Sequence, residues 1–217
     1  AHPSGWLVGK VGGLFTWMNL PRPGELDLIT AMPLWVQFIV FLLFRDFLEW
    51  CVHNLLHRTS WLWIFHKLHH SIVEMDWIGN FRFHWMETIV YGTLTWLPLT
   101  MLGVRSEVLL PIAVLSTFIG HLNHANVRFD YGWLRYVVNS PRMHIWHHDE
   151  VMHLKDGQNF GIVLSVWDWL FRTAYMPRTP EQPERLGFEK LDRFPTGLLS
   201  RITYPVSRMW TRPPTGP

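Results

Sequence analysis

Ten of the thirteen histidines in this 217-residue sequence fall in four short groups whose spacing suits metal binding. Within each group they recur at i, i+3 or i, i+4, and on a helix these positions lie on one face, one turn apart. Neutral imidazole binds iron, zinc, copper and nickel. Because ten imidazoles exceed the four that one tetrahedral ion takes, the pattern predicts a site for two ions. The ten are His53, His57, His66, His69, His70, His121, His124, His144, His147 and His148.

The composition narrows both the kind of site and the class of protein. A single cysteine, Cys51, excludes a disulfide framework, a cysteine-built zinc ribbon and a cysteine-ligated iron–sulfur cluster. The formal net charge of +2, without a run of Lys or Arg, argues against a nucleic-acid partner. Only 17% of the residues are charged and 14 are Trp, which is typical of a membrane protein.

Three uncharged runs predict the membrane helices that would position these histidines. They cover residues 28–44, 88–104 and 108–127, at the lower edge of the length that spans a bilayer. The short polar break Arg105-Ser106-Glu107 between the last two predicts a membrane hairpin. Helices buried in a soluble core are the alternative, although a chain of this length has room for only a small enclosed core.

The basic residues indicate how this arrangement is oriented in the membrane. Sixteen of the nineteen Lys and Arg lie in segments 45–87 and 128–217, which the hairpin places on one side. Cytoplasmic segments carry the excess of these residues, and the ten grouped histidines fall on the same side. We therefore expect an all-α integral membrane protein, in which transmembrane helices carry a cytoplasmic helical cap that holds a His-rich dimetal site.

Several motifs between Arg45 and Met176 resemble, in content and order, the fatty acid hydroxylase and sterol desaturase superfamily of integral-membrane di-iron oxygenases. They are RDFLEWCVHNLLHR, LWIFHKLHHS, RFHWME, HLNHANVR, SPRMHIWHHD and NFGIVLSVWDWLF. The third motif departs from the family pattern, which often has HPxE where this chain has HWME. The resemblance implies eight motif ligands, with His124 and His121 as additional ones from the hairpin. The eight are His53, His57, His66, His69, His70, His144, His147 and His148.

The resemblance also implies a reaction. Two iron ions and O₂ would hydroxylate, or desaturate, an unactivated C–H bond of a membrane lipid such as a sterol or a fatty acyl lipid. Zinc can replace iron in a purified sample, because imidazole accepts both metals. The chain has no CxxCH, GxGxxG or second cysteine. We therefore expect an external electron donor, a reductase, cytochrome or ferredoxin, that docks on a basic face including Arg135, Arg142 and Lys155.

A membrane protein that binds or transports metal without oxygenase activity is the alternative function. Transport requires polar ligands along a path through the bilayer. Segments 28–44 and 88–120 contain no histidine and no carboxylate except Glu107 at the far turn. This pattern favours the oxygenase.

Other side chains near the histidines are candidates for orienting the ligands or for lining a substrate groove. Asp46 and Glu49 share a helical face with His53 and could accept the second N–H of a ligating imidazole. Ion pairing or capping near Arg45 and Arg58 is the alternative for both acids. His84, Asn123 and Asp149 are further candidates for orienting ligands, and we expect His153 to be exposed. The groove candidates are Phe83, Trp85, Met86, Trp146, Phe160 and Trp167, for which ordinary packing is the alternative.

The sequence divides into three parts. Residues 1–27 are expected to form an N-terminal interfacial or partial membrane segment, and residues 28–176 the membrane-embedded di-iron hydroxylase domain. Residues 177–217 are expected to form a cytoplasmic tail. The prolines of this tail argue against a long helix there.

Overall fold

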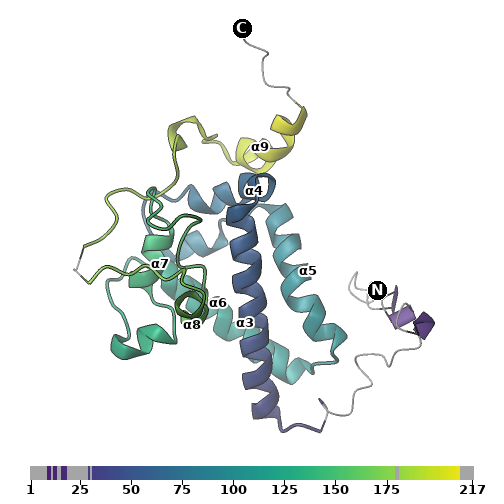
Figure 1. Ribbon diagram of the computed structural model, residues 1–217. Helices are drawn as coiled ribbons and strands as arrows, with labels where there is room; N and C mark the ends of the chain where they lie inside the picture. Colours follow the sequence, from purple (N-terminus) through teal and green to yellow (C-terminus); the bar gives the residue numbers. More distant parts are fainter. Residues whose placement is uncertain are drawn as a thin grey trace.

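A computed structural model describes residues 9–10, 12–13, 16–18, 29, 31–178 and 181–210, with the side chains of residues 205–210 excepted. Most of the expected N-terminal segment 1–27 lies outside these residues. In the described part the chain is helical, and its only β-type pairs are isolated bridges. Shorter elements lie at one end of three long helices and along one side of α3 (Figure 1). The elements are α3 (Leu34–Arg58), α4 (Ser60–His70), η2 (Trp77–Phe81), α5 (Trp85–Met101), α6 (Ser106–His124), η3 (Gly132–Tyr136), α7 (Pro141–His147), α8 (Val166–Leu170), η4 (Leu191–Arg193) and α9 (Leu198–Trp210).

The first long helix, α3, begins later and ends later than the uncharged run that predicts it. Its N-cap is Pro33, with φ −55° and ψ 145°, and a proline also disfavours helical backbone at the residue before it. The helix then continues past the end of the apolar run to Arg58, where Thr59 turns extended and α4 follows at once. One continuous helix therefore joins the apolar segment to His53 and His57.

Helices α5 and α6 form the expected helical hairpin. Its turn follows Leu102, and Gly103 adopts φ 74°, a left-handed conformation that glycine tolerates without strain. Beside the turn, Phe41 of α3 packs with Leu99 and Ile112, both of which are fully buried. These contacts fix the three long helices together at the end opposite the histidines.

Within the described residues, α6 is the one helix that is both long and apolar enough to cross a membrane. Helix α5 has 17 residues, and α3 contains Arg45, Asp46 and Glu49 near its middle. The three-span arrangement thus stays a prediction.

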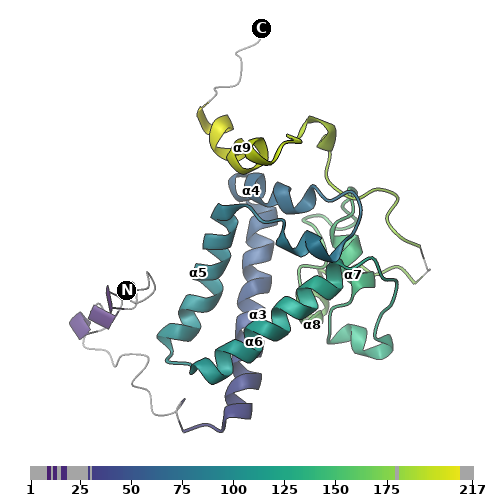
Figure 2. The ribbon, with the colours of Figure 1, turned by 180° about the vertical axis from the view of Figure 1, so that it is seen from behind.

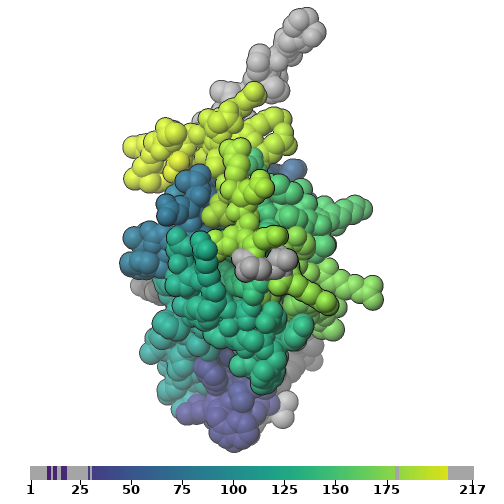
Figure 3. Space-filling model, turned by 90° about the vertical axis from the view of Figure 1, so that its left-hand side faces the viewer, coloured from purple at the N-terminus to yellow at the C-terminus, as the bar shows by residue number. Residues whose placement is uncertain are grey.

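The shorter elements gather at the other end of the long helices. Helix α6 runs obliquely from the turn after α5 towards α7 (Figure 2), and η2 packs along α6. The C-terminal part of the chain covers the end that carries α4, while the start of α3 lies at the opposite end (Figure 3). The expectation that prolines exclude a long helix from the tail is wrong for α9. This helix runs continuously over Leu198–Trp210, and Pro205 is the one proline within it.

Candidate metal centre

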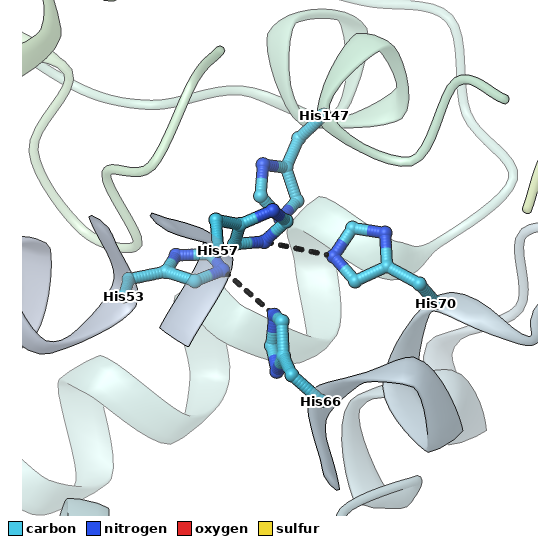
Figure 4. Close-up of side chains that lie close together, drawn as sticks. All are labelled: His53, His57, His66, His70 and His147. Atoms are coloured by element: carbon cyan, nitrogen blue, oxygen red, sulfur yellow. Dashed lines mark hydrogen bonds between the residues drawn. The ribbon is translucent and has the colours of Figure 1, made fainter. Parts of the chain in front are cut away.

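Nine of the ten grouped histidines come together in two clusters. Within each cluster the ligand atoms lie within 4.8 Å of one another. We call them the five-His cluster (Figure 4) and the four-His cluster. The five-His cluster contains His53, His57, His66, His70 and His147, and the four-His cluster contains His69, His124, His144 and His148.

The helical spacing of the motifs explains how the chain fills both clusters. In α4, His66 and His70 are one turn apart and face the five-His cluster, while His69 faces the other. Near the end of α7, His147 joins the five-His cluster, and its neighbour His148 joins the four-His cluster. The clusters are adjacent, because the rings of His70 and His148 stack with centroids 4.5 Å apart.

The distances between imidazole nitrogens match those expected of nitrogens that share a metal ion. The Nε2 atoms of His53 and His66 are 3.2 Å apart, and those of His57 and His70 are 3.1 Å apart. In the four-His cluster, His124 Nε2 lies 3.2 Å from the Nε2 atoms of both His69 and His144. An ion that binds imidazole at about 2.0–2.1 Å holds two such nitrogens about 3.3 Å apart at the tetrahedral angle.

Hydrogen bonds outside the clusters fix the tautomers of several rings. The Nδ1 atoms of His53, His124 and His147 donate to the carbonyl oxygens of Phe160, Gly120 and Gln158 over 2.7, 2.7 and 2.8 Å. A carbonyl oxygen only accepts, so Nδ1 carries the hydrogen in each of these rings. The lone pair of Nε2 therefore faces into the cluster, as a metal ligand requires.

Burial keeps the imidazoles of α4 and α7 neutral. The pKa values of His66, His69 and His70 are held well below 6.5, first by removal from water and then by repulsion from neighbouring imidazoles. The same two causes, in the same order, lower the pKa values of His144, His147 and His148. A neutral imidazole offers the lone pair that a metal ion binds.

Several of these nitrogens also lack a protein partner. His147 Nε2 and both ring nitrogens of His148 are buried, with no hydrogen-bond partner among the described residues. An unsatisfied buried polar group costs about 1–3 kcal/mol. The donor set of the two clusters therefore fits metal ions of the kind that imidazole holds.

Three other histidines lie outside both clusters. His121 was expected among the ligands, but its Nδ1 lies 2.8 Å from the Trp77 carbonyl oxygen and its ring packs on Phe81. His84 instead caps α5, where it accepts from the Met86 amide, and its Nε2 meets the Ile202 carbonyl of α9. His153 is exposed and donates to Asp149 over 2.7 Å.

The acids suggested as partners of ligating imidazoles make other contacts. Asp46 accepts from the amides of Val163 and Leu164 and from Trp167 Nε1. Glu49 forms an ion pair with Arg45 at 2.8 Å, which was the alternative interpretation. Asn123 donates to the Ile162 carbonyl, and Asp149 accepts from the Val151 amide. These residues hold the surrounding chain in place, and their hydrogen bonds go to other groups than the nine clustered imidazoles.

The carboxylate that contacts a clustered imidazole is Glu87, which was not among the acids expected to orient the ligands. Its Oε1 lies 2.6 Å from His66 Nδ1, and both side chains are fully buried. The signal was present in the sequence, because Glu87 ends the motif RFHWME. Sequence spacing alone did not connect it to His66, which lies on another helix.

The segment from Gln158 to Asp168 supplies carbonyls that orient His53 and His147, and the sequence reasoning did not identify Asp168 as its anchor. The buried Asp168 carboxylate accepts from the amides of Phe160 and Gly161, from Thr173 Oγ1 and from Trp50 Nε1. Burial raises its pKa. A Cβ at Gly161 would lie 2.2 Å from the Leu164 carbonyl oxygen, so the loop admits only glycine there.

A cavity of about 340 Å³ lies between α3, α5 and α6 and reaches the clusters. His53, His66, His69 and His124 line one part of it, and Arg45, Glu49 and Trp96 line another. Of the groove candidates, Phe83 lines this cavity. Trp146 instead lines a separate pocket with Tyr175, and Phe160 packs against His53.

Residues 38–173 match a family model described as fatty acid hydroxylase. The chain is 34% identical over 176 residues to an ornithine lipid hydroxylase of Rhizobium tropici, covering 81% of this chain and 52% of that protein. It is 24% identical to an alkylglycerol monooxygenase of Caenorhabditis elegans, over 67% of this chain and 28% of that protein. It is 23% identical to a methylsterol monooxygenase of Arabidopsis thaliana, over 80% of this chain and 55% of that protein. The chain thus spans about half or less of these relatives, and no solved structure matches it.

Proposed function

The chain belongs to the fatty acid hydroxylase family, and on this premise we propose that it is a membrane-bound, O₂-dependent di-iron enzyme that hydroxylates, or desaturates, a membrane lipid at an unactivated C–H bond. The observation that carries the proposal is the pair of buried imidazole clusters at the end of a cavity. The names of the three relatives support a lipid substrate, with an ornithine lipid, an alkylglycerol and a methylsterol as candidates.

The nine clustered histidines would hold the two ions, and bound iron would supply O₂ activation and hydrogen removal from carbon. The protein itself would orient the ligating imidazoles and shield the metal site from water. The carbonyls of Phe160, Gly120 and Gln158 orient the imidazoles, and burial excludes bulk water from the clusters. The cavity would bring a substrate carbon beside His53 and His69.

Exposed apolar side chains on the long helices support membrane embedding. Trp35, at 67% exposed, is one of several on the first half of α3, and Leu110 and Phe118 lie exposed on α6. Large exposed apolar surfaces of this kind mark contact with a membrane or a partner. We infer that the long helices lie in the bilayer and that the clusters face the cytoplasm; the excess of basic residues in segments 45–87 and 128–217 supports this orientation.

An external donor would supply the electrons. Arg135 and Arg142 both pair with Asp130, at 3.2 and 2.9 Å, so these two arginines tie one segment together. Reversing their charge would disturb that segment as well as any docking face. Lys155 is exposed and provides the cleaner test: Lys155→Glu should slow turnover with the native donor and leave turnover with a small chemical reductant unchanged.

The decisive experiment combines metal analysis with product analysis. Protein purified without oxygen should contain about two iron ions per chain, because the two clusters form two sites. Incubation with O₂, a reductant and a lipid panel should add 16 mass units to a substrate for hydroxylation, or remove 2 for desaturation. His147→Ala should lose metal and product together. Full activity in that variant would overturn the proposal, and metal flux into vesicles without a lipid product would favour the transport alternative.

A further inference from the structure

An ion pair in the wall of the cavity has no role in the proposed metal centre. Arg45 and Glu49 precede His53 on α3 by eight and four residues, so the three side chains lie on one helical face. Both line the same cavity as His53. At a rise of about 1.5 Å per residue, Arg45 and Glu49 lie about 12 and 6 Å from His53 along the helix axis.

The Arg45 guanidinium is held rigidly but is not fully satisfied. Its Nη1 and Nη2 donate to the two Glu49 oxygens over 2.8 and 3.1 Å, and Nη1 also donates to Ser116 Oγ over 3.0 Å. The guanidinium lies 4.4 Å from the centre of the Trp96 ring. Arg45 is 6% exposed, and its Nε–H is buried with no partner among the described residues. A pre-positioned cation with one unpartnered donor thus lines the cavity.

Stability alone is a weak explanation for this pair. Removing two charges from water costs about as much as their attraction returns, and apolar residues of similar volume often stabilise a protein as well or better. Ionisable residues within membrane helices usually mark a pathway or a binding site. Glu49 is 9% exposed, and it lines the cavity together with Arg45.

The two charges together select one class of ligand. A ligand with only a carboxylate would meet Arg45 but be repelled by Glu49, and a cation alone would have the opposite problem. A neutral sterol or alkylglycerol hydroxyl would leave Arg45 and Glu49 paired only with each other, and would give neither charge a second charged partner. A headgroup with both a carboxylate and an ammonium matches both side chains and leaves the cavity neutral.

We propose that Arg45 and Glu49 bind the zwitterionic, amino-acid headgroup of the lipid substrate, with the carboxylate on Arg45 and the ammonium on Glu49. This inference rests on the proposed function and names the substrate class of the same site. A cavity of about 340 Å³ is at the small end of ligand pockets and holds a headgroup rather than a whole lipid. Since the clusters lie about 6–12 Å further along α3, oxygen is added near the headgroup and not at the far end of an acyl chain.

The test compares an amino-acid lipid that has a free carboxylate and a free amine with its methyl ester and with its N-acetyl derivative. A lost charge-assisted hydrogen bond corresponds to about a 10- to 100-fold change in binding. The wild-type protein should therefore bind and turn over the zwitterionic lipid at least about tenfold better than either derivative. Binding is measured by equilibrium dialysis in detergent micelles on metal-free protein, and turnover on the iron-loaded protein.

Variants separate recognition from structure. Arg45→Met should bind the lipid and its methyl ester equally and should raise KM, while Glu49→Gln should lose the preference over the N-acetyl lipid. The double variant Arg45→Glu, Glu49→Arg keeps an ion pair but exchanges the charges, so it should not restore the wild-type KM. Arg105→Met removes an arginine from the exposed Arg105–Glu107 pair and should change none of these ratios.

The inference is overturned if the wild-type protein binds all three lipids equally, or if the charge-exchanged variant regains the wild-type KM. It is also overturned if a neutral lipid is bound and turned over better than the zwitterionic one. Failure of the proposed function gives a different pattern, in which iron-loaded protein oxidises no lipid of the panel while dialysis still reports the headgroup preference.

Discussion

Glu87 offers the sharpest test of how the protein holds its ligands. Its Oε1 lies 2.6 Å from His66 Nδ1, and the two side chains are 0% and 1% exposed. The bond fixes the ring so that His66 Nε2 faces His53 Nε2 at 3.2 Å. A buried hydrogen bond contributes about 0.5–1.5 kcal/mol, and up to about 3 kcal/mol when one group is charged, which corresponds to about a 2- to 150-fold change in an equilibrium constant.

We therefore expect Glu87→Ala to weaken metal binding at the five-His cluster about 10- to 100-fold, the range that such outer partners show in metal sites. Glu87→Gln should lose about tenfold or less, because its amide oxygen can still accept from Nδ1 but carries no charge. The measurement is a titration of metal-free protein with Zn²⁺ against a chromophoric chelator. Of the two equivalents of Zn²⁺ that the protein is expected to bind, one should bind with lower affinity than in the wild type.

The matched control is Glu74→Ala, which removes an exposed carboxylate near the end of α4. It should leave both affinities unchanged. If Glu87→Ala also kept both affinities at the wild-type value, the orienting role of this carboxylate would be refuted. Equal weakening of both equivalents in Glu87→Ala would mean instead that the substitution disturbs the fold around both clusters.

Three further predictions concern acid, ligand identity and the anchored loop. The imidazoles of α4 and α7 have pKa values below the unfolded value of about 6.5, so the unfolded chain binds more protons on acidification. Metal-free protein should keep its full stability above about pH 6.5 and lose up to about 1.4 kcal/mol per such group for each pH unit below it; a melting temperature that stays constant from pH 7.5 to 5.5 would contradict this. His148→Ala should reduce bound metal while His121→Ala should not, and plasma emission analysis of purified protein would expose an error if both lost equal amounts. Asp168→Asn should lower the free energy of unfolding by about 2–3 kcal/mol, as seen in the urea midpoint, whereas the exposed Asp192→Asn should leave that midpoint in place.

The difference between His121 and His124 shows where sequence reasoning about the site stops. A spacing of three residues puts two side chains on the same face but about 60° apart around the axis. The packing of η2 along α6 decides which of them points to the clusters, and His121 turns towards Trp77. Spacing predicts that histidines gather, whereas the choice between neighbours depends on long-range packing.

The contacts around the ligands were the least predictable part. Backbone carbonyls of Phe160 and Gln158 orient His53 and His147. Every residue has a backbone carbonyl, so the sequence does not indicate which ones accept these hydrogen bonds. Asp46 precedes His53 by nearly two turns, a spacing that suits an orienting carboxylate, but it accepts from the amides of Val163 and Leu164 instead. The helices themselves were more predictable, because apolar length and a polar break specify a helical hairpin locally.

The loop between Gln158 and Asp168 also sets the order in which a newly made chain becomes competent to hold metal. The ribosome delivers His53 to His70 first, yet the Phe160 carbonyl that orients His53 follows about a hundred residues later. Asp168, which fixes that loop, is made later still and takes one hydrogen bond from Trp50, on the first long helix. A nascent chain ending between His148 and Gln158 would therefore carry every clustered histidine without the carbonyls that orient His53 and His147. Under the proposed function, the five-His cluster would be fully oriented for metal only after residues 158–168, near the end of the family-matched region 38–173, have been synthesised.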